Sequence, residues 1–137
     1  MLPTLENGEF LVVNKLGYRL HQPLRGDIIV FQDPADAGRK LIKRIIGLPG
    51  ETVEMADGTV LIDGQVLPEP YLEDSGNYTR APSVLPTDQY FVLGDNRNNS
   101  SDSRSWGTLP REDIVGRAWL TYWPPRMWGV VPHADYE

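Results

Sequence analysis

Glycine and proline divide this chain into short segments, and that division restricts its possible folds more than any other feature. The 137 residues include 13 glycines and 12 prolines. They fall between short runs rich in Val, Ile, Leu, Phe and Tyr, which favour strands. No apolar stripe with a 3.6-residue period is long enough for a substantial helix. The pattern predicts strands within residues 9–18, 26–34, 40–50, 89–96 and 113–125.

Two residue pairs predict tight hairpins between the third and fourth of these strands. Asp57-Gly58 and Asp63-Gly64 lie within residues 51–68, and both residue types tolerate the positive φ that two-residue hairpin turns require. With so many turns and strands, we expect an all-β fold. Its form would be a compact folded sheet or small barrel with hairpins and a long polar loop.

The other segments predict loops within a single domain. Residues 68–87 are polar and interrupted by prolines, which indicates an extended loop or flap, and residues 110–114 predict one helical turn. A chain of 137 residues is long enough for one core but too short for two comfortable domains, so residues 1–137 are expected to form one. Residues 126–137 are expected to be a peripheral tail that lies over the barrel or frays.

Composition excludes several classes of function. The formal net charge is −6, from 13 Lys and Arg against 19 Asp and Glu, which argues against nucleic acid as a partner. The absence of cysteine excludes disulfides, thiolate zinc sites and cysteine nucleophiles. His21 and His133 have no metal-ligand spacing and are expected to be surface or packing residues. No apolar run approaches the roughly 20 residues of a membrane helix, so we expect a soluble polypeptide.

Lys43 stands in the middle of an apolar strand. Alternation places it on one face with Leu41 and Ile45 and places Ile42 on the other face. An ordinary lysine there would lay its stem on the apolar surface and extend its ammonium group into water. The alternative is a desolvated lysine that loses its proton at moderate pH and acts as a base.

The polar loop at residues 94–107 is the second unusual segment. It follows an apolar strand and contains many short Asn, Asp and Ser side chains, with Asp102 and Arg104 two positions apart. A plain solvated loop has this composition too, because these are common turn residues. Such side chains also form rigid polar networks, from which a hydroxyl group could orient a lysine amine.

These segments resemble the catalytic domain of the type I signal peptidases, serine proteases that cleave leader peptides with a Ser/Lys dyad. MLPTL, residues 1–5, resembles the second half of the family's Ser-Met-x-Pro-Thr-Leu box. Residues 25–31, 43–51 and 94–107 resemble its Arg-Gly-Asp box, its general-base box and its Gly-Asp-Asn-Arg box. The boxes follow the family's order and extend to about residue 117, which argues against a chance match.

The resemblance implies a role for each matched residue. Lys43 takes the position of the general base, and Ser100 takes that of the serine whose hydroxyl group orients the lysine amine. Asp95, Asp102 and Arg104 take the positions of the supporting ion-pair and hydrogen-bond residues. The family needs no metal or nucleotide, so no cofactor is expected. The family's nucleophilic serine would immediately precede Met1, and the sequence does not contain it. We therefore expect the chain as it stands to be inactive.

The resemblance also implies substrate, partners and location. The substrates would be signal peptides of secretory preproteins, with small residues near the cut, and an extended peptide would add as a strand at a sheet edge. A missing N-terminal anchor would hold the domain on the extracytoplasmic side of a bacterial cytoplasmic membrane. Trp123 and Trp128 fit contact with lipid or an ordinary core. The positions that match substrate-pocket residues are Met1, Leu5, Leu11, Val30, Leu41 and Ile42.

Two other readings remain open. The self-cleaving repressors share the fold and the dyad, but no DNA-binding domain or cleavage segment is visible in the sequence. A catalytically dead β module that binds peptides or partner proteins is the second. The retained Lys43 and the complete loop from Asp95 to Arg104 argue against it.

Overall fold

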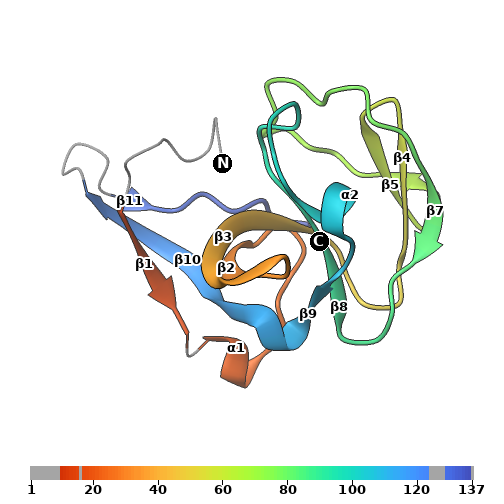
Figure 1. The fold of residues 1–137 in the computed structure, drawn as a ribbon. Helices are drawn as coiled ribbons and strands as arrows, with labels where there is room; N and C mark the ends of the chain where they lie inside the picture. Colours follow the sequence, from red (N-terminus) through yellow and green to blue (C-terminus); the bar gives the residue numbers. More distant parts are fainter. Residues whose placement is uncertain (1–9, 16, 124–128, 137) are drawn as a thin grey trace.

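Two antiparallel sheets make up most of the structure, a computed structural model that describes residues 10–15, 17–123 and 129–136. Figure 1 shows the larger sheet beside the smaller one, with β3 and β8 close to the junction. The larger sheet contains β1 (Phe10–Asn14), β2 (Ile28–Asp33), β3 (Asp36–Gly47), β8 (Gln89–Leu93), β9 (Leu109–Pro110), β10 (Ile114–Trp123) and β11 (Gly129–Val130). The smaller sheet contains β4 (Thr52–Ala56), β5 (Thr59–Ile62), β6 (Gln65–Val66) and β7 (Arg80–Val84).

The order of the larger sheet places its longest strand near the middle. The strands run β1-β10-β2-β3-β8-β9, and β11 also pairs with β10. β3 pairs with β2 on one side and β8 on the other, and Ile29 is the register partner of Lys43. The predicted strands at residues 26–34, 40–50, 89–96 and 113–125 correspond to β2, β3, β8 and β10. The expectation of a mostly β fold with little helix is confirmed.

The smaller sheet follows the order β6-β5-β4-β7 and contains both predicted hairpins. Asp57 and Asp63 have φ angles of 46° and 50°, and the glycines that follow them have 84° and 80°. These left-handed turn residues match the twist of the flanking strands, as two-residue hairpins require.

Three short helical turns complete the described part of the chain: α1 (Gly17–Leu20), α2 (Ser103–Trp106) and the 3₁₀ turn η1 (Arg111–Asp113). The turn predicted at residues 110–114 is confirmed by η1. The single strand predicted over residues 9–18 is wrong at its end, because β1 stops at Asn14. The Asn14 side chain accepts a hydrogen bond from the Gly17 N–H at 3.1 Å and turns the chain into α1.

The interpretation of residues 68–87 as a loop is also wrong in part, because its end forms a strand. Arg80–Val84 is β7, which pairs with β4, and Val53 is the register partner of Ser83. A proline at position 82 does not prevent this pairing because β7 is an edge strand of its sheet. The first part of the segment, residues 68–79, contains no strand.

Apolar side chains pack where the two sheets meet. At the end of β3, a Cβ on Gly47 would lie 2.6 Å from Val53 Cγ2 and 2.8 Å from Leu85 Cδ1. Only glycine therefore lets the two sheets approach this closely. A second cluster lies on the face of the larger sheet that carries Leu41 and Ile45. The cluster at the junction comprises Ile46, Val53, Met55, Val60, Ile62, Leu85, Phe91 and Leu93.

The described C-terminal residues pack on the larger sheet. Val131 is 1% exposed. The Nδ1 of His133 accepts a hydrogen bond from the Ile28 N–H at 2.8 Å, and its Nε2 lies 2.7 Å from the Ala118 carbonyl oxygen, to which it donates. The predicted packing role of His133 agrees with these contacts. Trp128 lies outside the described residues, as does the side chain of Trp123. Among the helices described, none is sufficiently long and apolar to span a bilayer.

Candidate active site

Lys43 lies on an apolar face of β3. Leu41 and Ile45 flank it along the strand, and Ile29 faces it across the pair with β2; all three are buried. Lys43 itself is only partly buried. Desolvation by this surrounding lowers the pKa of the ammonium group below its ordinary value, although the charge of Asp102 opposes the shift. The environment thus favours a neutral amine, which can act as a base.

Gly94 brings the amine and a hydroxyl group to the same place. It follows β8 directly, and a Cβ added to it would lie 2.0 Å from Ser100 Oγ and 3.5 Å from Lys43 Nζ. The loop after β8 therefore folds back so that Ser100 and Lys43 lie on the same side of Gly94. Ser100 Oγ is buried and makes no hydrogen bond within the described part of the chain. Its proton and lone pairs are available to a neighbour that approaches.

Asp102 holds the returning loop against the end of β8. Its Oδ2 accepts a hydrogen bond from the Gly94 N–H at 3.1 Å, and Arg104 donates to both carboxylate oxygens, from Nε at 2.9 Å and from Nη2 at 2.8 Å. Burial alone would raise the pKa of Asp102, but these hydrogen bonds outweigh it and hold the pKa below its usual range. Asp102 also caps α2 by accepting from the Arg104 N–H.

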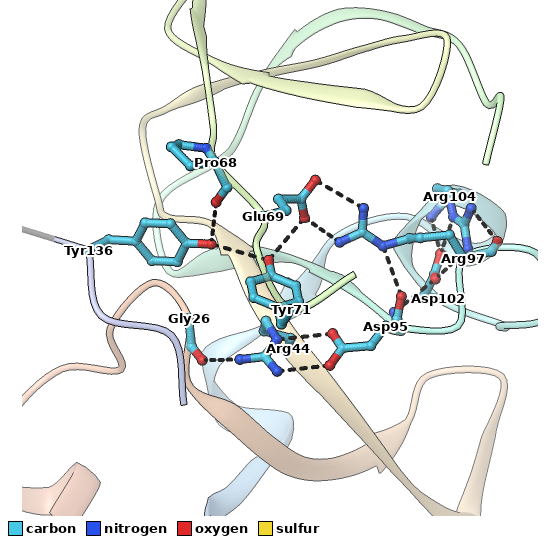
Figure 2. Close-up of polar contacts among 11 residues, drawn as sticks. Gly26, Arg44, Pro68, Glu69, Tyr71, Asp95, Arg97, Asp102, Arg104 and Tyr136 are labelled. Carbon is cyan, nitrogen blue, oxygen red and sulfur yellow. Dashed lines mark hydrogen bonds and ion pairs between the residues drawn. The ribbon is translucent and has the colours of Figure 1, made fainter. Parts of the chain in front are cut away.

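Asp95 pairs with a different arginine, on the other face of β3. Arg44 donates to its two carboxylate oxygens from Nε at 2.9 Å and from Nη2 at 2.8 Å, and to the Gly26 carbonyl oxygen at 3.0 Å. Both side chains are almost fully buried. Figure 2 shows this pair beneath the ring of Tyr71, whose centroid lies 3.9 Å from the guanidinium carbon. Asp95 directly follows Gly94, and Arg44 directly follows Lys43. Their ion pair therefore holds the start of the loop against β3.

Arg97 is a site residue that sequence reasoning did not identify. Its Nε donates to the Gly94 carbonyl oxygen at 2.9 Å, and its side chain has no exposed surface. Glu69, from the segment after β6, forms an ion pair with it. Both backbone polar groups of Gly94 are thus held by side chains, the N–H by Asp102 and the carbonyl by Arg97. The signal that could have found it is its place as the arginine of the Gly-Asp-Asn-Arg box.

The predicted pocket residues that the structure describes do not share one face. Leu41 lies on the Lys43 side of β3, whereas Val30 and Ile42 are register partners on the opposite side. Val30 and Leu41 are buried, at 7% and 9% exposure, and Ile42 is partly buried. Met1 and Leu5 lie outside the described residues, as does the side chain of Leu11.

The arrangement provides a base and an orienting hydroxyl group. A partly desolvated amine beside a buried hydroxyl can accept a proton from a nucleophile that approaches Lys43. In the part of the chain that the structure describes, no group of three or more His, Asp or Glu side chains could hold a metal ion. The chemistry that these residues support is proton transfer at a lysine.

Comparison with known proteins identifies the family. Residues 1–123 match the family described as signal peptidase, peptidase S26. The chain is 49% identical over 131 residues to a signal peptidase I of Leptolyngbya laminosa, with 90% of this chain and 64% of that protein covered. It is 34% identical over 142 residues to signal peptidase IB of Staphylococcus aureus, covering 90% and 73%. The chain therefore belongs to the signal peptidase family, a family of serine proteases.

The relatives also show which part of such a protein this is. A crystal structure of a signal peptidase I from Enterococcus faecalis has a TM-score of 0.61 and 39% identity, and covers 71% of this chain and 97% of that one. Thylakoidal processing peptidase 2 of Arabidopsis thaliana is 38% identical over 132 residues, which are 91% of this chain and 36% of that protein. The chain covers the catalytic domain region of signal peptidase I.

Proposed function

We propose that this chain is the catalytic core of a signal peptidase that removes N-terminal signal peptides from exported preproteins. The observation that carries the proposal is the placement of Lys43 Nζ and Ser100 Oγ within 3.5 Å of one point beside Gly94. The buried aliphatic face around Lys43 supports it, because it lowers the pKa of the amine. Membership of the family supplies the substrate class.

In the proposed reaction Lys43 is the general base. The nucleophile is the serine that, by the family's motif, precedes Met1. Its proton moves to Lys43 Nζ as its oxygen attacks the carbonyl carbon of the scissile peptide bond. Lys43 then gives the proton to the leaving amine, and water hydrolyses the acyl-enzyme. With a pKa near 10.4, only about 0.4% of a lysine is neutral at pH 8, so each unit of lowering supplies about ten times more base.

Ser100 orients the amine in this scheme, and Asp95, Asp102 and Arg104 fix the loop that carries it. Ser100 Oγ has the capacity for this role, since no described residue bonds to it. The ion pairs Arg44–Asp95 and Arg104–Asp102 are buried, so the loop is held from both faces of β3. A loop held in this way limits the motion of the reacting groups, and this restriction lowers the barrier of the reaction.

Substrate recognition is proposed at the same strand. The signal peptide would add as an extended strand at an exposed edge, with its small residues near Leu41, Val30 and Ile42 and with Met1, Leu5 and Leu11 completing the pockets. The whole protein would act at a bacterial cytoplasmic membrane with the catalytic domain on the extracytoplasmic side. Thylakoid relatives make a photosynthetic membrane a second location of the same kind. No metal or nucleotide takes part in the scheme.

A paired activity measurement tests the function. The 137-residue chain and the same chain extended upstream to include the serine are compared on a synthetic signal-peptide substrate. Only the extended chain should cleave, because a base without its nucleophile leaves binding and weak electrostatic assistance. Equal rates would contradict the assignment of the nucleophile.

Covalent labelling separates an enzyme from a module that only binds peptides. A penem should acylate the serine of the extended chain, and mass spectrometry would detect the adduct. Substituting the added serine by alanine is the control and should abolish it. Peptide binding without adduct or turnover would favour the binding module.

A further inference from the structure

The segment after β6 packs against the rear of the candidate active site. Glu69 and Tyr71 both lie in it. Glu69 forms an ion pair with Arg97, and the ring of Tyr71 lies over the guanidinium group of Arg44. Figure 2 shows these contacts together, with Glu69 beside Arg97 and Tyr71 over Arg44. The prolines and polar residues of this segment predict only a loop or flap and do not connect it with catalysis.

Glu69 neutralises a cation that holds Gly94. Its Oε1 accepts a hydrogen bond from Arg97 Nη1 at 3.1 Å, and its Oε2 pairs with Arg97 Nη2. Burial opposes the charge of Arg97, and the bonds and charge of Glu69 more than compensate, so the pKa of the guanidinium group is raised. The exposed fractions are 0% for Arg97 and 7% for Glu69. A buried guanidinium group without this carboxylate would move toward water.

Tyr71 connects the same segment to the second arginine. Its ring lies over Arg44, and its hydroxyl group donates to Glu69 Oε2 at 2.9 Å. Figure 2 shows both contacts. Tyr136, near the C-terminal end, donates to the Pro68 carbonyl oxygen at 2.8 Å and lies 3.2 Å from the Tyr71 hydroxyl. The segment after β6 and the C-terminal segment therefore meet at Tyr71 and Tyr136.

We propose that Glu69 and Tyr71 are positioning residues for the Lys43 and Ser100 pair, acting through Arg97 and Arg44. Arg97 holds the Gly94 carbonyl, and Ser100 packs so tightly against Gly94 that an added Cβ would lie 2.0 Å from Ser100 Oγ. Release of Arg97 lets the chain at Gly94 move, and water then reaches Lys43. This inference rests on the proposed function for its link to catalysis, but its structural effect is measurable without turnover.

The test is the pKa of Lys43, measured by NMR titration of the lysine side-chain signals. The chain has three lysines, at positions 15, 40 and 43, so a K43M sample assigns the signal. In E69Q the pKa of Lys43 should rise toward its ordinary value, because water entry weakens desolvation, the largest cause of the shift. Y71L should raise it as well, and Y71F, which keeps the ring over Arg44, should raise it less.

Glu51 supplies a matched control. It forms a similar ion pair with Arg25, with both hydrogen bonds at 2.7 Å and partial burial, and neither side chain bonds to Gly94 among the described contacts. E51Q should lower the melting temperature without moving the pKa of Lys43. If E69Q behaves like E51Q, Glu69 serves stability alone and the inference is overturned. A lower pKa in E69Q would indicate a direct charge effect and would overturn it too.

A second measurement links the effect to catalysis. In the serine-containing protein, E69Q should lower kcat by about tenfold for each unit that the pKa of Lys43 rises, at a pH below that pKa. KM should change much less, since Glu69 does not contact the substrate strand's proposed path. If E69Q changes the pKa of Lys43 but the serine-containing parent never cleaves, the proposed function is refuted and the positioning role is still supported.

Discussion

Ser100 Oγ occupies the position that a side chain on Gly94 would need: an added Cβ would lie 2.0 Å from it. No strained φ explains this glycine, because its backbone is not in the left-handed region. Space alone explains it, since the loop after β8 must return close enough to bring Ser100 beside Lys43. Gly94 thus sets the distance between the base and its orienting hydroxyl group.

The first prediction concerns that space. G94A should lower kcat/KM of the serine-containing protein by about a hundredfold, the cost of a displacement of about 1 Å at a reacting group. The matched control is G129A, because a Cβ at Gly129 meets nothing within 4 Å and its φ is ordinary. Steady-state kinetics on a signal-peptide substrate would measure both. Wild-type activity in G94A would show that catalysis does not depend on the close approach of Ser100 to Lys43.

The second prediction concerns the hydroxyl group itself. S100A should lower kcat by about a hundredfold, at the lower end of the contribution of a positioned general base, and should leave KM nearly unchanged. Ser101 is the neighbouring residue and is exposed, so S101A is the control for a local change in the loop. If both variants lose the same activity, the effect belongs to the loop and the orienting role of Ser100 is wrong.

The third prediction follows from the lowered pKa of Lys43. Between the folded pKa and about 10.4, the unfolded chain binds more protons at this residue than the folded chain, so stability rises with pH over that window. K43M removes the desolvation cost and should stabilise the protein at pH 7, with a gain that shrinks above the folded pKa. Urea unfolding from pH 7 to 10 would measure it. Equal stability of the two chains across the window would mean that Lys43 is not desolvated.

The regular part of the fold could be predicted from sequence because its signals are local. The Asp57-Gly58 and Asp63-Gly64 pairs predict their hairpins through turn geometry alone. The alternation around Lys43 predicts which neighbours share its face. The end of β1 could not be predicted this way, because it depends on one bond from Gly17 to the side chain of Asn14.

The site could be predicted only as far as its motifs extend. Lys43 and Ser100 follow from the family's boxes, but the position of Ile29 opposite Lys43 depends on the register of β2 and β3. The pair between Glu69 and Arg97 depends on how the smaller sheet's loop meets the loop after β8. The packing of the two sheets determines such contacts between distant segments, and no local sequence pattern predicts that packing.

The fourth prediction concerns His133, whose Nδ1 accepts a hydrogen bond from the Ile28 N–H and whose Nε2 donates to the Ala118 carbonyl oxygen, a bond that raises its pKa. Burial and the charge of Arg117 lower its pKa, although Asp27, with Oδ1 3.9 Å from His133 Nδ1, opposes this. As the pH falls, His133 therefore takes up its proton at a higher pH in the unfolded chain than in the folded chain. Stability should fall as the pH drops below about 6.5 toward the folded pKa. H133Q should flatten the difference in unfolding free energy between pH 7 and 5. The exposed His21 is the control, and H21Q should leave the slope as it is.

The fifth prediction concerns the buried pair of Arg44 and Asp95. D95A removes the carboxylate that faces a guanidinium group with 1% exposure, and should cost about 3–5 kcal/mol of unfolding free energy. The double variant R44M/D95A removes both charges and should be more stable than D95A, because no buried cation then lacks its carboxylate. Urea unfolding of the chain would measure both. A double variant less stable than D95A would show that Arg44 stabilises the fold mainly through Gly26 and Tyr71, independently of Asp95.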